Sequence, residues 1–225
     1  MPASHLKRKI APKTWPILRK TVTFITRPKP KGQSLAFTIP VVVAMRDILG
    51  VVQTANQARK VLRSTDIKVN GTLVRDVDSA VGFMDILEIA GSKHRLTLNV
   101  NNLLTLVPVR KGEEFTVEKV IGITSIKGGK TQLNCASGRN MFVEKGQYRP
   151  GDSIQVSLEG KLGERYPLAT GASVLVIGGK HIGAIGKIVS LEGGVVQVES
   201  EGAAFTTNAR NAYVVGKDTP AISLN

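Results

Sequence analysis

The sequence predicts a mainly β protein of several small domains, with one small α/β part and a basic N-terminal arm. After residue 64, short apolar runs alternate with Gly, Asn and Pro turn signals, which is typical of antiparallel sheets. Residues 38–64 instead show helical spacing of apolar residues. Charge gives the third observation, because residues 1–46 hold ten of the 31 lysines and arginines and none of the 17 acidic residues. The predicted divisions are 1–38, 39–100, 101–168 and 169–225.

The basic arm, residues 1–38, is expected to meet a polyanion, because most of the net charge of +14 lies before the first acid, Asp47. Nucleic acid and an anionic membrane surface both fit. Four prolines disfavour the amphipathic helix of a transit peptide or membrane anchor, and no apolar run approaches the length of a membrane span. We therefore predict an extended arm along phosphates, disordered without RNA because residues 1–35 offer little apolar surface. Trp15 is expected to pack on the protein's own body.

The cations of this segment are the first candidate RNA-binding residues. They are Lys7, Arg8, Lys9, Lys13, Arg19, Lys20, Arg27, Lys29, Lys31 and, just beyond the arm, Arg46.

Residues 39–100 predict two helices, a hairpin and further strands. Pro40 suits a first helical position, and Thr54 with Gln57 three residues later forms a capping-box signature for the helix "ANQARKVLRS". Asn70-Gly71 joins two short β runs and predicts a type I′ hairpin turn. Ala58, Val61 and Leu62 would face inward, which leaves the cations of this helix mostly exposed.

The rest of the chain predicts antiparallel β structure. In residues 101–168, "FTVEKVIGITSI", "TQLN" and "SIQVSL" read as strands, with turns at 127–130, 137–138 and 150–152. In residues 169–225, "SVLVI" and "AIGKIVSL" flank a glycine-rich loop. That loop is neither a P-loop, since Ile188 follows Lys187 where Ser or Thr is needed, nor a G-x-G-x-x-G fingerprint.

No constellation for catalysis, a metal or a cofactor is present in the sequence. The three histidines are scattered, Cys135 stands alone and predicts a small buried residue, and no Cys/His spacing suggests zinc. We therefore predict a protein that is not an enzyme, with no catalytic residue, metal site or cofactor.

Two segments resemble known modules that contact RNA. The order of helices and hairpin, with "ARKVLRS", "IKVNG" and "LEI", resembles the small S-four RNA-binding domain. This implies RNA contact by Arg59, Lys60, Arg63, Lys68 and Arg75, although solvated surface charge is the alternative. "VLVIGGKHIGAIGKI" resembles the KOW motif of SH3-like barrels, which implies contacts near Lys180, His181 and Lys187.

All four pieces together, with "HLKRKIAPKTWPI", "RDILG" and "GFMDILEI", resemble the S-four-e family of archaeal and eukaryotic small-subunit ribosomal proteins. Without the longer C-terminal region of eukaryotic members, the chain resembles an archaeal one. The resemblance implies a cytoplasmic structural constituent of the small subunit, with small-subunit ribosomal RNA and neighbouring ribosomal proteins as partners, and no membrane or small-molecule partner. Two alternatives stay open: a free RNA-binding or transcription-elongation regulator using the KOW barrel, and an RNA-modifying enzyme.

Overall fold

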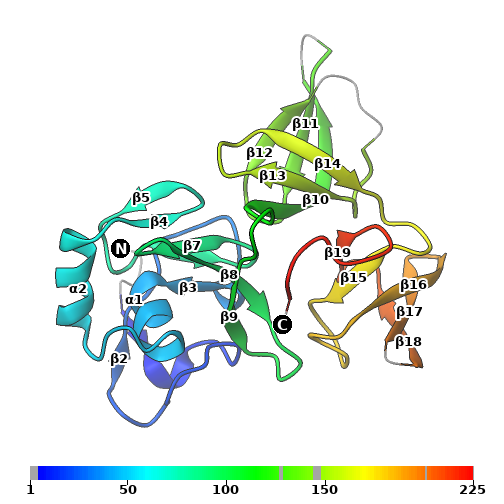
Figure 1. Ribbon diagram of the computed structural model, residues 1–225. Coiled ribbons are helices and arrows are strands. Elements are labelled where there is room, and N and C mark those ends of the chain that lie inside the picture. Colours follow the sequence, from blue (N-terminus) through cyan, green and yellow to red (C-terminus); the bar gives the residue numbers. More distant parts are fainter. Residues whose placement is uncertain (1–4, 127–128, 144–147, 201, 225) are drawn as a thin grey trace. The chain divides into compact units, whose positions relative to one another are not determined.

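The computed structural model describes residues 5–126, 129–143, 148–200 and 202–224. The chain divides into two compact units: unit one comprises Met1–Leu98 and Asn102–Val109, and unit two comprises Asn99–Asn101 and Arg110–Asn225. Antiparallel sheets dominate both units, and helices are few and short (Figure 1). The mainly β prediction is confirmed.

Unit one is built on a five-stranded antiparallel sheet with the order β5-β4-β7-β8-β9. Its strands are β4 (Ile67–Val69), β5 (Thr72–Val74), β7 (Ile86–Ile89), β8 (Ser92–Leu98) and β9 (Leu104–Pro108). A smaller ladder joins β3 (Thr38–Pro40) to β6 (Ala80–Gly82). Since β9 pairs with β8, the first sheet continues past the predicted domain boundary at residue 100.

Two helices accompany this sheet. In the first, Pro40 is the N-cap rather than the first helical residue, α1 covers Val41–Val43, and the helix continues as a π-helix, Ala44–Ile48. The N–H of Leu49 donates to the Ala44 carbonyl at 3.0 Å, the i→i−5 bond of a π turn. In α2 (Ala55–Ser64) the predicted capping box is present, with Gln57 N–H donating to Thr54 Oγ1 and Thr54 N–H to Gln57 Oε1.

The predicted hairpin turn is also confirmed. Asn70 and Gly71 both have positive φ, 50° and 78°, and Val69 pairs with Thr72, as a two-residue type I′ turn requires. The Asn70 side chain is buried, where its amide donates to Asp85 Oδ1 at 2.7 Å and its oxygen accepts from Ile86 N–H at 2.8 Å. The turn is thereby tied to the start of β7.

Unit two contains two five-stranded antiparallel sheets. The first has the order β12-β11-β10-β13-β14, and Val120, Leu133, Val143 and Ile154 form its core. Its strands are β10 (Phe115–Ser125), β11 (Thr131–Cys135), β12 (Asn140–Val143), β13 (Ser153–Ser157) and β14 (Leu162–Tyr166). The three predicted strands match β10, β11 and β13, while the predicted 127–130 turn lies partly outside the described residues.

The second sheet is a half-barrel with the order β18-β17-β16-β15-β19 (Figure 1). Its strands are β15 (Ser173–Val176), β16 (Ile185–Glu192), β17 (Val195–Ser200), β18 (Ala203–Asn208) and β19 (Ala212–Gly216). The predicted strand–loop–strand is β15, the 177–184 loop and β16. At Gly186 a Cβ would lie 2.3 Å from the Glu199 carbonyl oxygen, so the close approach of β17 requires glycine.

Buried polar contacts join the two sheets of unit two. Tyr213 in β19 donates its hydroxyl to the Val117 carbonyl of β10 at 2.6 Å. The Lys119 ammonium donates to the carbonyls of Ala209, Arg210 and Ala212 at 3.1, 2.9 and 2.6 Å. One lysine of β10 thus satisfies the carbonyls that lead into β19.

Candidate nucleic-acid interface

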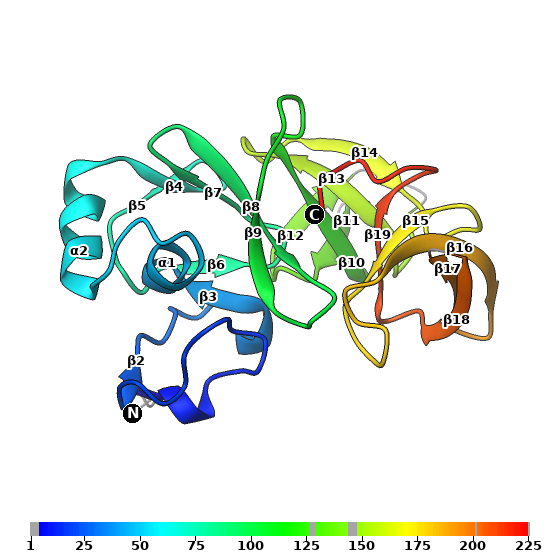
Figure 2. The ribbon, with the colours of Figure 1, turned by 60° about the horizontal axis from the view of Figure 1, so that its bottom comes forward.

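The basic arm is folded in its described part, residues 5–38, which contradicts the predicted disorder. β1 (Leu6–Lys7) pairs with β2 (Phe24–Ile25), and a 3-10 helix, Arg8–Ile10, follows β1 (Figure 2). Trp15 is 1 % exposed and its indole N–H donates to the Leu35 carbonyl at 3.2 Å, so the expected packing on the protein's own body is confirmed. With Leu6, Ala11 and Ile25 also buried, the arm has a small core that its overall charge concealed.

Polar contacts dock the end of the arm onto the rest of unit one. Lys31 forms an ion pair with the buried carboxylate of Asp85, and Lys29 pairs with Asp76. The Gln33 side chain accepts from Phe83 N–H at 2.8 Å and donates to the Phe83 carbonyl at 3.1 Å. The arm therefore lies against the 76–85 segment instead of extending away from it.

These contacts divide the arm's cations into two groups, which the sequence could not distinguish. Arg8 is 5 % exposed and donates to the Leu18 carbonyl at 2.6 Å. Arg19 donates to the carbonyls of Ala11 and Pro12, both at 2.7 Å. Since Lys29 and Lys31 pair with carboxylates, these four side chains hold the arm together or dock it. Arg46 likewise pairs with its neighbour Asp47 at 2.7 Å.

The remaining cations give the arm a positive surface. Lys7, Lys9, Lys13, Lys20 and Arg27 are exposed. Three of them converge with Arg19 on a shallow hollow of about 520 Å³, the arm hollow. It is lined by Lys7, Lys9, Arg19, Lys20, Thr21, Val22 and Thr23. None of these lining residues is acidic, so the potential of the hollow is positive and attracts anions.

Helix α2 presents a second cationic surface. Ala58 and Leu62 are buried, which turns Arg59, Lys60 and Arg63 outward, and all three are exposed. Arg59 donates to Asn56 Oδ1 at 2.7 Å, a partner that leaves its charge unneutralised.

The hairpin residues are less available. Arg75 donates to the Leu62 carbonyl and to Asp66, both at 2.9 Å. Lys68 is half-buried and lies opposite Glu88 in the β4–β7 register. Their charges are therefore at least partly balanced within unit one.

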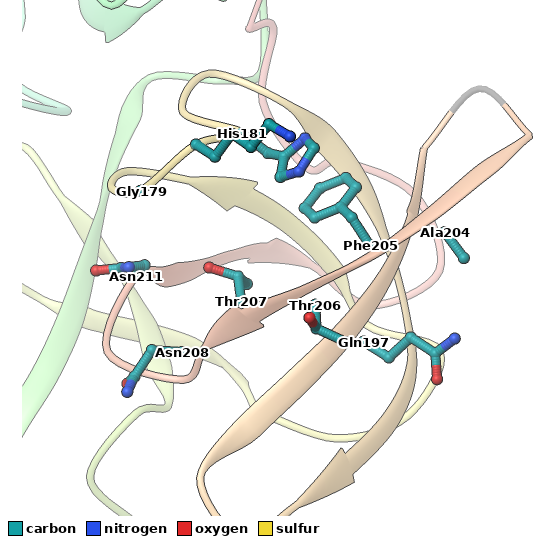
Figure 3. Close-up of a pocket in the computed structure, with 10 residues that line it drawn as sticks. Gly179, His181, Gln197, Ala204, Phe205, Thr206, Thr207, Asn208 and Asn211 are labelled. Atoms are coloured by element: carbon teal, nitrogen blue, oxygen red, sulfur yellow. The ribbon is translucent and has the colours of Figure 1, made fainter.

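In the half-barrel, the three residues predicted to contact RNA do not lie at one site. Lys180 and His181 line a pocket, in which the His181 ring stacks on Phe205 at 4.1 Å between ring centroids (Figure 3). Lys187 lies outside it, opposite Glu199 in β17. Sequence reasoning missed Phe205, because nothing in "AAFTTN" marks a single Phe as the neighbour of a loop more than 20 residues away.

Buried ionisable groups outside these surfaces do not form a reactive site. Burial lowers the pKa of Lys119 to about 8, and burial, with Glu118 nearby, raises the pKa of Cys135 to about 12. Within the described residues, no group of three or more His, Cys, Asp or Glu side chains could hold a metal ion. In the same part of the chain, no helix is both long and apolar enough to cross a bilayer.

Comparison with known proteins identifies the family. A family model described as Ribosomal family S4e matches residues 90–162, and the RS4NT domain model matches residues 2–30. The small ribosomal subunit protein eS4 of Methanosphaera stadtmanae is 36% identical over 98% of this chain and 95% of its own length. The chain belongs to the S4e family of ribosomal proteins.

Other S4e proteins are also similar to this chain over most of its length. The eS4 protein of Methanospirillum hungatei is 37% identical, covering 97% of this chain and 96% of that protein. The crystal structure of the 30S ribosomal protein S4e from Thermoplasma acidophilum matches with a TM-score of 0.71 at 25% identity. That match covers 80% of this chain and 95% of the solved chain. The expected resemblance to archaeal S4e proteins is confirmed.

Proposed function

We propose that this S4e protein is a structural constituent of the small ribosomal subunit that binds folded small-subunit ribosomal RNA through phosphate and shape contacts. The observation that carries the proposal is the acid-free arm hollow in a chain whose eS4 relatives match nearly its full length. A cationic concave surface with few aromatic side chains suits backbone and shape recognition of folded RNA. The family is structural, so the protein is not an enzyme.

The RNA-binding residues of this proposal are the exposed cations of two surfaces. They are Lys7, Lys9, Lys13, Lys20 and Arg27 of the arm, and Arg59, Lys60 and Arg63 of α2. The proposal leaves out Arg8, which is buried, and the cations that pair with or face an acid: Lys29, Lys31, Arg46, Lys68, Arg75 and Lys187. Arg19 donates only to neutral carbonyls and lines the arm hollow, so its charge adds to that surface.

The finer domain assignment belongs to the same proposal. Two helices followed by the β4–β5 hairpin support the S-four-like domain predicted over 39–100, and the pairing of β9 with β8 extends its sheet to Pro108. The β15–loop–β16 unit within the half-barrel supports a KOW SH3-like barrel over 169–225. It follows the central β domain predicted over 101–168, whose sheet begins with β10 at Phe115.

Neighbouring ribosomal proteins are the second class of partner. Large apolar side chains of the arm are exposed: Ile10, Leu18, Val22 and Phe24. Such side chains beside a cationic surface fit contact with protein or with the sugar face of RNA, and cytoplasmic small subunits offer both.

Sedimentation tests the proposal most directly. After lysis and a high-salt wash, sucrose gradients should show the protein in small subunits at one copy per particle. Recovery in the free pool or with RNA polymerase would instead favour the regulator, and either result would overturn the structural role. The eS4 relatives match nearly the full length of this chain. This match favours the ribosomal role over both alternatives, the regulator and the RNA-modifying enzyme.

A further inference from the structure

A pocket of about 610 Å³ opens beside strand β18 of the half-barrel (Figure 3). One wall is the 179–181 loop segment, and the other is β18 with the turn that leads to β19. We call it the edge pocket. Its lining residues are Gly179, Lys180, His181, Gln197, Ala204, Phe205, Thr206, Thr207, Asn208 and Asn211.

An aromatic pair marks one side of the edge pocket. The rings of His181 and Phe205 are nearly parallel, at an interplanar angle of 16° and a centroid distance of 4.1 Å. Both residues are only half-buried. Each ring covers one face of the other, so a planar heterocycle would extend the stack on an outer face of the pair.

Backbone groups of β18 supply hydrogen-bonding positions next to this surface. β18 is an edge strand, paired only with β17 among the described strands. The N–H of Ala209 donates to the Gly194 carbonyl at 2.9 Å. By the alternation of an antiparallel ladder, the N–H and C=O groups of Ala204 and Thr206 then point away from β17. An N–H beside a C=O can pair with the edge of a nucleobase.

Side-chain amides add to these positions. In the described part of the chain, the Asn211 amide has no hydrogen-bond partner, and it packs on Gly178, where a Cβ would lie 2.8 Å from Asn211 Oδ1. The backbone of Asn211 is fixed by bonds to Asn208 and Ile177. The side chain is thus positioned while its donors and acceptor stay available.

Charge completes the site, because Lys180 is exposed and no acid lines the pocket. We infer that the edge pocket binds one unpaired nucleobase of an RNA, stacked on the His181–Phe205 pair and read by Thr206 and Asn211, with its phosphate near Lys180. The inference rests on the proposed RNA binding and adds a contact to a base to the phosphate and shape contacts proposed above.

A peptide strand added to β18 is the competing occupant of an exposed edge. The edge pocket favours a single planar ligand, because the 179–181 segment lines the same hollow that the added strand would occupy. Aromatic rings, amides and a lysine around one space are also the groups with which proteins hold extruded bases.

Mononucleotide titration tests the site in the full-length protein. In heteronuclear NMR spectra, 5′-AMP, 5′-GMP, 5′-CMP and 5′-UMP should each be added, with ribose 5-phosphate as the control for phosphate alone. At least one nucleotide should give saturable shifts at the Thr206 amide and the Asn211 side-chain amide. Phe205→Leu should weaken that affinity by at least about fivefold and Phe205→Tyr should retain it, because stacking needs a ring.

Phe142→Leu is the matched control, since Phe142 is an exposed aromatic of β12 in the same unit and lies outside the pocket. Equal shifts with ribose 5-phosphate, or no saturable shift at Thr206 and Asn211, would overturn the inference. A photo-crosslinking residue in place of Phe205 should form a crosslink to RNA in intact subunits. A crosslink to a protein would overturn the inference in favour of an added peptide strand. Because mononucleotides need no ribosome, failure here is distinct from failure to sediment with small subunits.

Discussion

Cys135 shows at the scale of one residue how burial governs reactivity. Its thiol is buried, and its pKa of about 12 keeps it protonated near neutral pH, whereas the thiolate is the reactive form. We expect a disulfide reagent such as DTNB to label the native protein far more slowly at pH 8 than the protein in denaturing urea. Equal labelling rates in the two states would contradict this burial.

Lys119 should make stability depend on pH, because its pKa differs between the native and unfolded states. Burial lowers its pKa from 10.5 to about 8, so between these values the unfolded chain binds a proton that the native protein does not. The unfolding free energy should therefore rise with pH, by up to about 1.4 kcal/mol per pH unit. Cys135 acts against this rise above pH 9, because its raised pKa makes the native state hold a proton that the unfolded chain loses.

Comparison of the wild type with Lys119→Met separates the effect of Lys119 from that of Cys135, because both proteins contain the Cys135 thiol. Urea unfolding from pH 8 to pH 10 should show the stability difference growing in favour of the wild type. A difference that does not change with pH would contradict the lowered pKa of Lys119.

The limits of sequence reasoning are clearest for individual cations. Lys7 and Arg8 are neighbours of like charge, yet Lys7 is exposed and Arg8 is buried against Leu18 and Thr21. Which of them is free depends on how the arm folds back between β1 and β2, a contact between residues about 10 to 13 positions apart. Charge and spacing alone carry no information on that contact.

Among the secondary-structure elements, the hairpin turn gives the sharpest test. Gly71 has a φ of 78°, a conformation that a β-branched residue adopts only with strain. We expect Gly71→Val to lower the unfolding free energy of unit one by at least about 1 kcal/mol. Thr72→Val, an exposed neighbour in β5, is the control and should melt close to the wild type; equal melting of Gly71→Val would contradict the turn.

Helix α2 should matter for RNA and not for folding. Its three cations are exposed while Ala58 and Leu62 supply the packing, and glutamine retains helix propensity. Replacing Arg59, Lys60 and Arg63 with Gln should leave the circular dichroism spectrum unchanged and weaken binding to small-subunit RNA. Unchanged affinity at matched salt would assign these charges to solvated surface.

Elements that are determined by a few adjacent residues could be predicted from the sequence. Elements that depend on contacts between residues far apart in the sequence could not. The capping box of α2, the Asn70-Gly71 turn and the strands flanking the glycine-rich loop each follow from a few adjacent residues. The fold of the arm does not, because its core forms only when Trp15 reaches the backbone of Leu35. A highly charged segment with few apolar residues resembles a disordered one until those few are brought together.

For the whole molecule, the exposed arm lysines should dominate the salt dependence of RNA binding. Changing Lys7, Lys9, Lys13 and Lys20 to Gln removes four cations without touching the residues that dock the arm. If all four meet phosphate, the log–log salt slope should become shallower by roughly 3 units in filter binding to small-subunit RNA.

The control for this test carries the same net charge. Its substituted residues are Lys111, Lys130, Lys161 and Lys217, four exposed lysines of unit two. These substitutions should leave the slope much closer to that of the wild type. Equal slopes for the two variants would mean that net charge, and not the arm hollow, sets the affinity.

The docking of the arm also has a consequence for the order of events during synthesis. Lys31 emerges 54 residues before its partner Asp85, and Thr14, whose carbonyl accepts from Leu104 N–H, must wait longer still. At translation rates of about 5–20 residues per second, the nascent arm is unanchored for roughly 3 to 10 s. During that interval its cations are without their carboxylate partners, while the chain is still attached to the RNA-rich ribosome that is making it. The arm is therefore translated before the residues that hold it in place and is anchored only after they have followed.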